Sequence, residues 1–178
     1  MKKVKFKYCG VEFEIRESAY RAVDYYGKPI TPKFDIGRVE GASMIKQYIK
    51  KNYPSLKVWS VSDSFSMGNS IDVYICNEDC STVSDEIHKE ISTFANSLRM
   101  GRFNGMIDMY EHKEWDNHTD DGVLMDTHCK YIHVNNKPKF GTIEWGINRL
   151  MEDPEETKEG LLYYIDKNKK EKFLELAI

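Results

Sequence analysis

Two short segments of the chain repeat each other and place carboxylates beside phenols. Residues 71–74 read Ile-Asp-Val-Tyr, and residues 107–110 read Ile-Asp-Met-Tyr. On β-strands, side chains alternate between the two faces, so the polar members of both segments would point away from the apolar members. These polar residues are Asp72, Tyr74, Asp108 and Tyr110. If the strands lie near each other, we expect Asp72 and Asp108 on one sheet face, with a proton, a cation or a donor between them.

Hydroxyl and amide side chains precede both segments. Residues 62–70 read Ser-Asp-Ser-Phe-Ser-Met-Gly-Asn-Ser, and residues 103–105 read Phe-Asn-Gly. We expect these groups and the tyrosines to form a binding face. The candidate binding residues are Ser64, Ser66, Asn69, Tyr74, Asn104 and Tyr110. Alternatively, Ser, Asn and Asp only fasten the loop to the sheet through local hydrogen bonds.

The aspartates of the same segments offer a catalytic alternative. Asp63, Asp72 and Asp108 are hard oxygen ligands, which suit a divalent ion such as Mg²⁺ in phosphodiester cleavage. No obvious nucleophile and base accompany them. We therefore assign them catalytic roles, with Mg²⁺ as cofactor, only if the protein is a nuclease; otherwise no cofactor is expected.

The two motifs also carry a family resemblance. Residues 62–73, followed by residues 103–110, resemble the large polyvalent protein-associated domain found in proteins of phages, plasmids and other mobile elements. The likeness covers about residues 43–111. The resemblance indicates where the protein occurs more than what it does, because such domains occur in proteins that mobile elements carry into a bacterial host or deploy inside it. A small protein dominated by this domain also resembles some type II-A anti-CRISPR proteins, whose target is Cas9 loaded with guide RNA.

The resemblance implies a mobile-element accessory protein that antagonises host defence in the cytoplasm of a bacterium. Its partner would be a defence ribonucleoprotein, Cas9 with guide RNA, which it would bind and inhibit without being an enzyme. One alternative is a ribonuclease, or an activator of guide-RNA cleavage. Another is a non-catalytic structural or interaction module. The resemblance assigns no role outside residues 43–111.

A histidine-rich acidic stretch follows the second motif. Residues 111–129 contain His112, His118 and His128 among many acidic residues. Histidine and carboxylate side chains can serve as metal ligands or as general acids and bases. However, their spacing matches no recognised ligand pattern, and acidic polar runs are usually solvated loops. Cys76 and Cys80 form the one close cysteine pair, which is a poor zinc signature, so we expect free thiols.

Apolar periodicity predicts the N-terminal elements. Alternation around Cys9 and Gly10 predicts a hairpin of residues 4–8 and 11–15. Residues 18–40 contain two prolines and two glycines and show no sustained period, so we expect an irregular arm.

The middle of the chain should form two helices and three strands. One helix should run over residues 43–52 from a Ser43 cap, and another over residues 82–98 from Ser81 or Thr82. The apolar face of the second helix is Val83, Ile87, Ile91, Phe94 and Leu98. The expected strands are residues 58–62, 71–76 and 106–110, and the loop joining the first two is too long for a two-residue turn.

This order of elements predicts an α+β fold, a small sheet with both helices packed on one face. Beyond it we expect a short strand at residues 131–134, a short helix at 142–151 and a lysine-rich helix at 159–177. We therefore treat residues 1–178 as one domain. Its parts are the hairpin and arm (1–40), the core (43–111), and an acidic loop with a helical extension (112–178).

Composition and charge set broad limits. The 178 residues are 40% hydrophobic and 31% charged, which is typical of a folded globular protein. No apolar run approaches the length of a membrane span or a signal segment, so we expect a cytosolic protein. Residues 1–60 carry 13 Lys and Arg against 6 Asp and Glu, whereas residues 61–178 carry 13 against 23. The basic part suits phosphate contacts and the acidic part suits a basic protein surface, unless folding interleaves the two.

Overall fold

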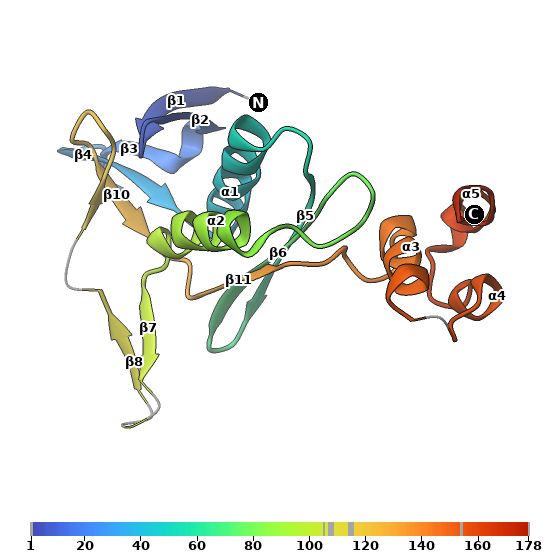
Figure 1. The fold of residues 1–178 in the computed structure, drawn as a ribbon. Helices are drawn as coiled ribbons and strands as arrows, with labels where there is room; N and C mark the ends of the chain where they lie inside the picture. Colours follow the sequence, from blue (N-terminus) through green and yellow to red (C-terminus); the bar gives the residue numbers. More distant parts are fainter. Residues whose placement is uncertain (1, 105, 107–108, 114–115, 154, 178) are drawn as a thin grey trace.

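The α+β class predicted from the sequence is confirmed. A computed structural model describes residues 2–177 except 105, 107–108, 114–115 and 154. Small sheets and helices alternate along the described chain, with a β-hairpin at the N-terminal end and helices at the C-terminal end (Figure 1). In the part of the chain that is described, no helix combines the length and apolar character needed to cross a membrane.

The N-terminal hairpin forms as predicted. Strand β1 (Lys3–Tyr8) pairs antiparallel with β2 (Val11–Arg16). The two turn residues, Cys9 and Gly10, both have positive φ angles, of 51° and 74°. A two-residue turn with positive φ at both positions matches the twist of the strands that it joins.

The prediction of an irregular arm over residues 18–40 was wrong. After a short 3₁₀ turn (Glu17–Ala19), β3 (Tyr20–Val23) and β4 (Pro29–Ile36) form a second hairpin. Pro29 is tolerated because it is the first residue of its strand. Strand β4 also pairs in parallel with β10 (Leu124–Thr127), which pairs with the short β9 (Asn117–His118). The strand order of this sheet is β3-β4-β10-β9.

The first long helix is longer than predicted. Helix α1 (Arg38–Asn52) begins after Gly37, so Ser43 lies inside the helix and is not its cap. The Ser43 hydroxyl instead accepts a hydrogen bond from Gln47 at 3.1 Å. The predicted apolar stripe is confirmed, because its four members are buried. They are Met44, Ile45, Tyr48 and Ile49.

The second long helix begins later than predicted. Helix α2 (Asp85–Ser97) is capped by Ser84, whose hydroxyl accepts from the Ile87 amide, so neither Ser81 nor Thr82 is the cap. The backbone before it is held outside the helix, because the Val83 amide donates to a side-chain oxygen of Asn136 at 2.8 Å. The predicted apolar face is confirmed. Ile87 is partly buried, and Val83, Ile91, Phe94 and Leu98 are buried.

The central sheet contains three strands in the order β11-β6-β5. Strand β5 (Lys57–Phe65) pairs antiparallel with β6 (Gly68–Cys76), and β11 (Tyr131–Asn135) lies parallel to β6. Phe65 pairs with Gly68, so the connection is a two-residue turn and the long loop predicted here was wrong. Helices α1 and α2 pack on one face of this sheet (Figure 1).

The third predicted strand does not belong to that sheet. Strand β7 (Gly101–Asn104) pairs with β8 (Met109–His112) in a separate two-stranded ribbon, and β6 has β5 and β11 as its neighbours. Ile107 and Asp108 lie outside the described residues, so their positions relative to Asp72 stay untested. The third strand of the central sheet is β11.

Two hydrophobic clusters stabilise the described chain. The larger one joins the N-terminal hairpin, α1, α2 and the central sheet. The smaller one joins α3 (Ile143–Glu152), α4 (Lys158–Leu161) and α5 (Lys170–Leu176), which lie beyond the end of β11 (Figure 1). The single lysine-rich helix predicted over residues 159–177 was therefore wrong. A turn interrupts it where the Asp166 amide donates to the Gly141 carbonyl at 3.0 Å.

Candidate functional site

The central sheet has one face away from the helices. Ile71, Val73 and Ile75 are completely buried beneath α1 and α2, so Asp72 and Tyr74 point to the opposite face. Strand register extends this opposite face across β5 and β11. We call it the open sheet face, and its residues, all half-buried or exposed, are Trp59, Val61, Asp63, Phe65, Ser70, Asp72, Tyr74, Tyr131 and His133.

Two carboxylates lie on the open sheet face without partners. Asp63 pairs with Ser70, which is two residues from Asp72, so the two aspartates are diagonal neighbours on adjacent strands. Neither side chain makes a hydrogen bond or an ion pair within the described part of the chain. Partial burial raises the pKa of Tyr74, and the negative charge of Asp72 raises it further. The face therefore carries negative charge that the described residues do not pair with a cation.

Aromatic rings surround these carboxylates. Trp59 lies opposite Tyr74 in the β5–β6 pair. Toward the other end of the face, the rings of Phe65 and Tyr131 are stacked, with centroids 6.1 Å apart. Tyr110 meets the same Tyr131 ring edge to face, also at 6.1 Å. The open sheet face is thus a row of rings with the two aspartates between them.

Asn69 and Tyr110, two of the predicted binding residues, hold the backbone before β11. The Asn69 amide group donates to the His128 carbonyl and accepts from the Lys130 amide, both at 2.9 Å. The Tyr110 hydroxyl donates to the Lys130 carbonyl at 2.8 Å. These bonds span between 20 and 61 residues of sequence. Asn69 and Tyr110 therefore fasten one part of the chain to another, as the alternative interpretation expected, but through long-range hydrogen bonds and not local ones.

The other predicted site residues are dispersed. Ser64 pairs with Asn69 and points away from the open sheet face, and Ser66 lies in the turn. Asn104 belongs to β7, and Asp108 lies outside the described residues. Of the predicted catalytic and binding residues, the structure therefore brings Asp63, Asp72 and Tyr74 together on this face, with Tyr110 at its end. Sequence reasoning missed Trp59, Tyr131 and His133, although the alternation of their strands carries the signal.

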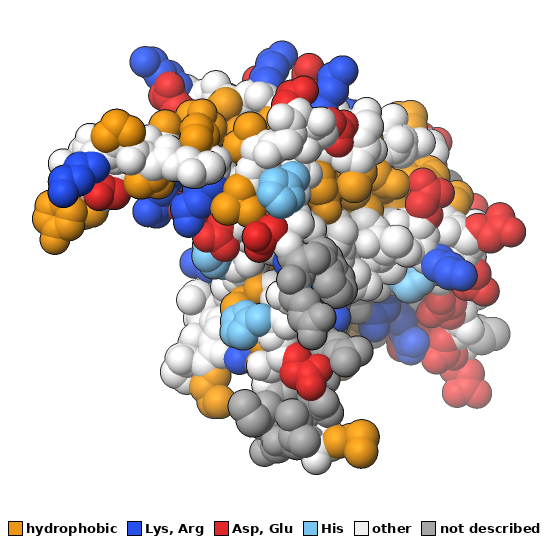
Figure 2. Space-filling view, turned by 90° about the vertical axis from the view of Figure 1, so that its left-hand side faces the viewer, with side chains coloured by type: hydrophobic (Ala, Val, Ile, Leu, Met, Phe, Trp, Pro, Cys, Tyr) orange, Lys and Arg blue, Asp and Glu red, His pale blue; other side chains and the backbone are white. Residues whose placement is uncertain are grey.

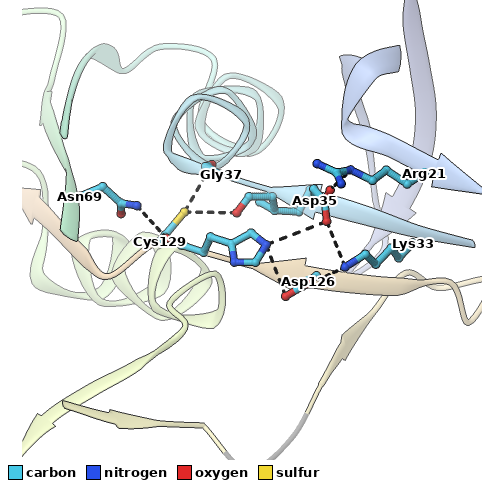
Figure 3. Close-up of polar contacts among 9 residues, drawn as sticks. Arg21, Lys33, Asp35, Gly37, Asn69, Asp126 and Cys129 are labelled. Atoms are coloured by element: carbon cyan, nitrogen blue, oxygen red, sulfur yellow. Dashed lines mark hydrogen bonds and ion pairs between the residues drawn. The ribbon is translucent and has the colours of Figure 1, made fainter. Parts of the chain in front are cut away.

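A second polar cluster joins β4 to β10. Asp35 lies opposite Asp126 in the parallel register, and ligand atoms of these two residues and His128 all lie within 4.8 Å of one another. Lys33 Nζ lies 2.7 Å from an Asp126 oxygen and 3.4 Å from an Asp35 oxygen, and Arg21 forms an ion pair with Asp35 (Figure 3). Figure 2 shows histidine, carboxylate and cationic side chains intermingled on this side of the molecule.

The electrostatics of this cluster are those of an ion-pair network. Partial burial raises the pKa of Asp126, but the Lys33 hydrogen bond and the nearby positive charges outweigh burial and lower it. The hydrogen bond to Asp126 raises the pKa of Lys33. Two cations thus balance two carboxylates, and a divalent ion would have to displace Lys33. Sequence analysis singled out the His128 region but missed Asp35, because β4 was predicted to be irregular.

Cys129 has a structural environment. It is completely buried, and its thiol donates to the carbonyls of Ile36 at 3.8 Å and Gly37 at 3.5 Å. Burial raises the pKa of this thiol to about 12, so it is not a reactive thiolate at neutral pH. Asn69 lies next to Cys129 (Figure 3). It binds the residues on both sides of Cys129 and so fixes the same segment.

Comparisons with known proteins give no relative: no family model, curated protein or solved structure matches this chain. Of the two clusters, the open sheet face has unsatisfied charge, whereas the Asp35 cluster is internally balanced.

Proposed function

We propose that this chain is a mobile-element accessory protein that antagonises bacterial host defence by binding Cas9 loaded with guide RNA. The observation that carries the binding role is the open sheet face, where Asp63 and Asp72 lie unpaired among aromatic rings. Exposed charged and aromatic side chains of this kind favour recognition of a partner. The choice of Cas9 rests on the motif resemblance of residues 43–111. The proposed place of action is the bacterial cytoplasm.

Among the described residues, which do not include Asp108, the arrangement of the aspartates favours binding over catalysis. A Mg²⁺-dependent ribonuclease would need several oxygen ligands converging on one point. Within the described residues, the group of three ligands that does converge is Asp35, Asp126 and His128, and neither Asp63 nor Asp72 belongs to it. Lys33 and Arg21 already neutralise that group. A ribonuclease, or an activator of guide-RNA cleavage, is the alternative that the experiment must separate.

The experiment mixes the purified chain with a type II-A Cas9, guide RNA and Mg²⁺. Size-exclusion chromatography measures association, a target-DNA assay measures Cas9 activity, and a denaturing gel measures guide-RNA length. We expect co-elution with Cas9, loss of DNA cleavage and guide RNA of unchanged length. Shortened RNA would contradict the binding proposal, and a chain that neither co-elutes nor inhibits would contradict the choice of Cas9.

A matched pair of variants extends this experiment. The test variant is Asp63→Asn with Asp72→Asn, which removes two charges from the open sheet face while nearly preserving size. The control variant is Asp121→Asn with Glu175→Gln, which removes two exposed charges from other parts of the chain. We expect the test variant to weaken association and inhibition and the control to retain both, with circular dichroism confirming that both fold. The nuclease would be favoured by a different result: the native chain shortens the guide RNA, and the folded test variant loses both this shortening and the inhibition of Cas9.

A further inference from the structure

The open sheet face has an uneven balance of free charge. Asp63 and Asp72 are unpaired in the described chain, whereas two lysines near the face, Lys57 and Lys130, already have contacts within the chain. Lys57, at one end of β5, lies 3.7 Å from a Glu144 oxygen. Lys130, at the start of β11, donates to the Met67 carbonyl at 2.8 Å. Glu144 balances Lys57, and Lys130 keeps its positive charge, because its partners are a carbonyl and two rings. The two aspartates outweigh Lys130, so the balance of these charges is negative, with the exposed His133 beside Asp72.

The rings of this face already hold one cation of the chain itself. Lys130 Nζ lies 5.0 Å from the centroid of the Tyr110 ring and 5.5 Å from that of Tyr131. These distances are within the range in which a cation is attracted to the electron-rich face of an aromatic ring. At the other end of the face, Trp59 pairs with Tyr74 across β5 and β6. Asp72 is two residues before Tyr74 and is its nearest neighbour on the same face of β6.

Two kinds of partner use aromatic rings on a sheet, and charge distinguishes them. Single-stranded RNA stacks its bases on such rings but needs positive charge for its phosphates. An arginine side chain stacks its planar guanidinium on a ring and also donates two parallel hydrogen bonds to a carboxylate. Unpaired aspartates among the rings repel phosphates and attract guanidinium groups.

We propose that the open sheet face binds arginine side chains on a basic protein segment, with Asp63 and Asp72 accepting hydrogen bonds and Trp59 and Tyr74 stacking on the guanidinium groups. This inference rests on the proposed function, because it assigns the partner chemistry of the same face. In a complex with a ribonucleoprotein, this chain contacts the cationic protein surface and leaves the RNA free of direct contact with the face.

Fluorescence anisotropy with defined probes tests this assignment on the full chain. The probes are a labelled peptide in which arginine alternates with serine, matched lysine and glutamine peptides, and a short labelled oligouridylate. We expect the arginine peptide to bind most tightly, the lysine peptide more weakly, and the glutamine peptide and the oligouridylate not measurably. Tighter binding of the oligouridylate than of the arginine peptide would overturn the proposal.

The variants connect the binding to particular residues. Asp63→Asn with Asp72→Asn should weaken arginine-peptide binding about tenfold, since two charge-assisted contacts are lost. The Asp121→Asn and Glu175→Gln control should change it less than about twofold. Tyr74→Leu should reduce the preference for arginine over lysine, because stacking favours the planar group. Equal losses in the test and control pairs would show a diffuse charge effect and overturn the site.

Cas9 association, measured on the same protein preparations, separates the two proposals. A chain that co-elutes with Cas9 but does not bind the arginine peptide retains the proposed function and contradicts the arginine site. Conversely, peptide binding that depends on Asp63 and Asp72, without Cas9 association, supports the arginine site and contradicts the choice of Cas9.

Discussion

Replacing Phe94 with alanine should lower the free energy of unfolding by about 3 to 5 kcal/mol. Phe94 is 6% exposed and belongs to the main hydrophobic cluster. Its ring is stacked on Tyr48 of α1, with centroids 4.0 Å apart and an interplanar angle of 5°, and on Phe13 of β2 at 5.6 Å. The substitution removes the buried ring and leaves a cavity where α2, α1 and the N-terminal hairpin meet. The ring also meets Tyr8 of β1 at 6.1 Å, so the loss of three aromatic pairs places the expected cost toward the upper part of this range.

Urea denaturation followed by circular dichroism measures this cost, with Phe140→Ala as the matched control. Phe140 is 60% exposed, so its truncation should cost less than about 1 kcal/mol. A cost below about 1 kcal/mol for Phe94→Ala would refute the packing of α2 against α1 and β2. The aromatic contacts of Phe94 lie on α1 and the N-terminal hairpin.

Three further predictions concern the polar contacts. Asn69→Ala should lower the free energy of unfolding by about 1 to 3 kcal/mol, because it removes two hydrogen bonds to the backbone. The control, Ser64→Ala, should change the free energy of unfolding by less than about 0.5 kcal/mol in the same urea assay. The pKa of Asp126 is lowered, so its carboxylate stabilises the fold above about pH 4, and this stabilisation is lost as the pH falls through the folded-state pKa. In thermal melts, Asp126→Asn should therefore lose less stability on acidification than the native chain does. Burial and Glu90 raise the pKa of Tyr48 to about 12, so the stability from its neutral hydroxyl should be lost as the pH rises from about 10 to about 12, and Tyr48→Phe should flatten this alkaline loss in the same melts.

Local sequence patterns predicted the elements whose signals lie within a few residues. The Cys9-Gly10 turn, the apolar stripe of α1 and the apolar face of α2 all formed. Alternation in residues 71–74 correctly placed Ile71 beneath the helices and Asp72 on the opposite face. In each case, a helical or strand period is visible in the sequence itself.

The missed elements depend on contacts between distant parts of the chain. Strand β4 carries two prolines and has few buried residues, and its partner β10 lies about 90 residues later in the chain. Residues 63–69 have the composition of a loop, yet cross-strand pairing continues the hairpin to Phe65 and Gly68. The third strand of the central sheet was assigned to residues 106–110, because no local pattern connects β6 to Tyr131–Asn135.

The candidate site was predicted in part for the same reason. The strand period identified Asp72 and Tyr74 as neighbours on one face, and that face is open. Asn69 was predicted to bind a partner, but its contacts with residues 128 and 130 could be found only from the fold. Likewise, Asp35 and Asp126 meet because two distant strands pair in parallel, which neither segment indicates alone.

Site-specific photo-crosslinking tests the central claim, that the open sheet face contacts Cas9, most directly. Photoreactive p-benzoylphenylalanine replaces Tyr74 on this face in one variant and Tyr163, which is 83% exposed in the turn after α4, in the control. Each variant is irradiated with Cas9 and guide RNA, and the products are separated on denaturing gels stained for protein and for RNA. We expect a crosslink from position 74 to the Cas9 protein and none from position 163. A crosslink from position 163 alone, or from position 74 to the guide RNA alone, would contradict it.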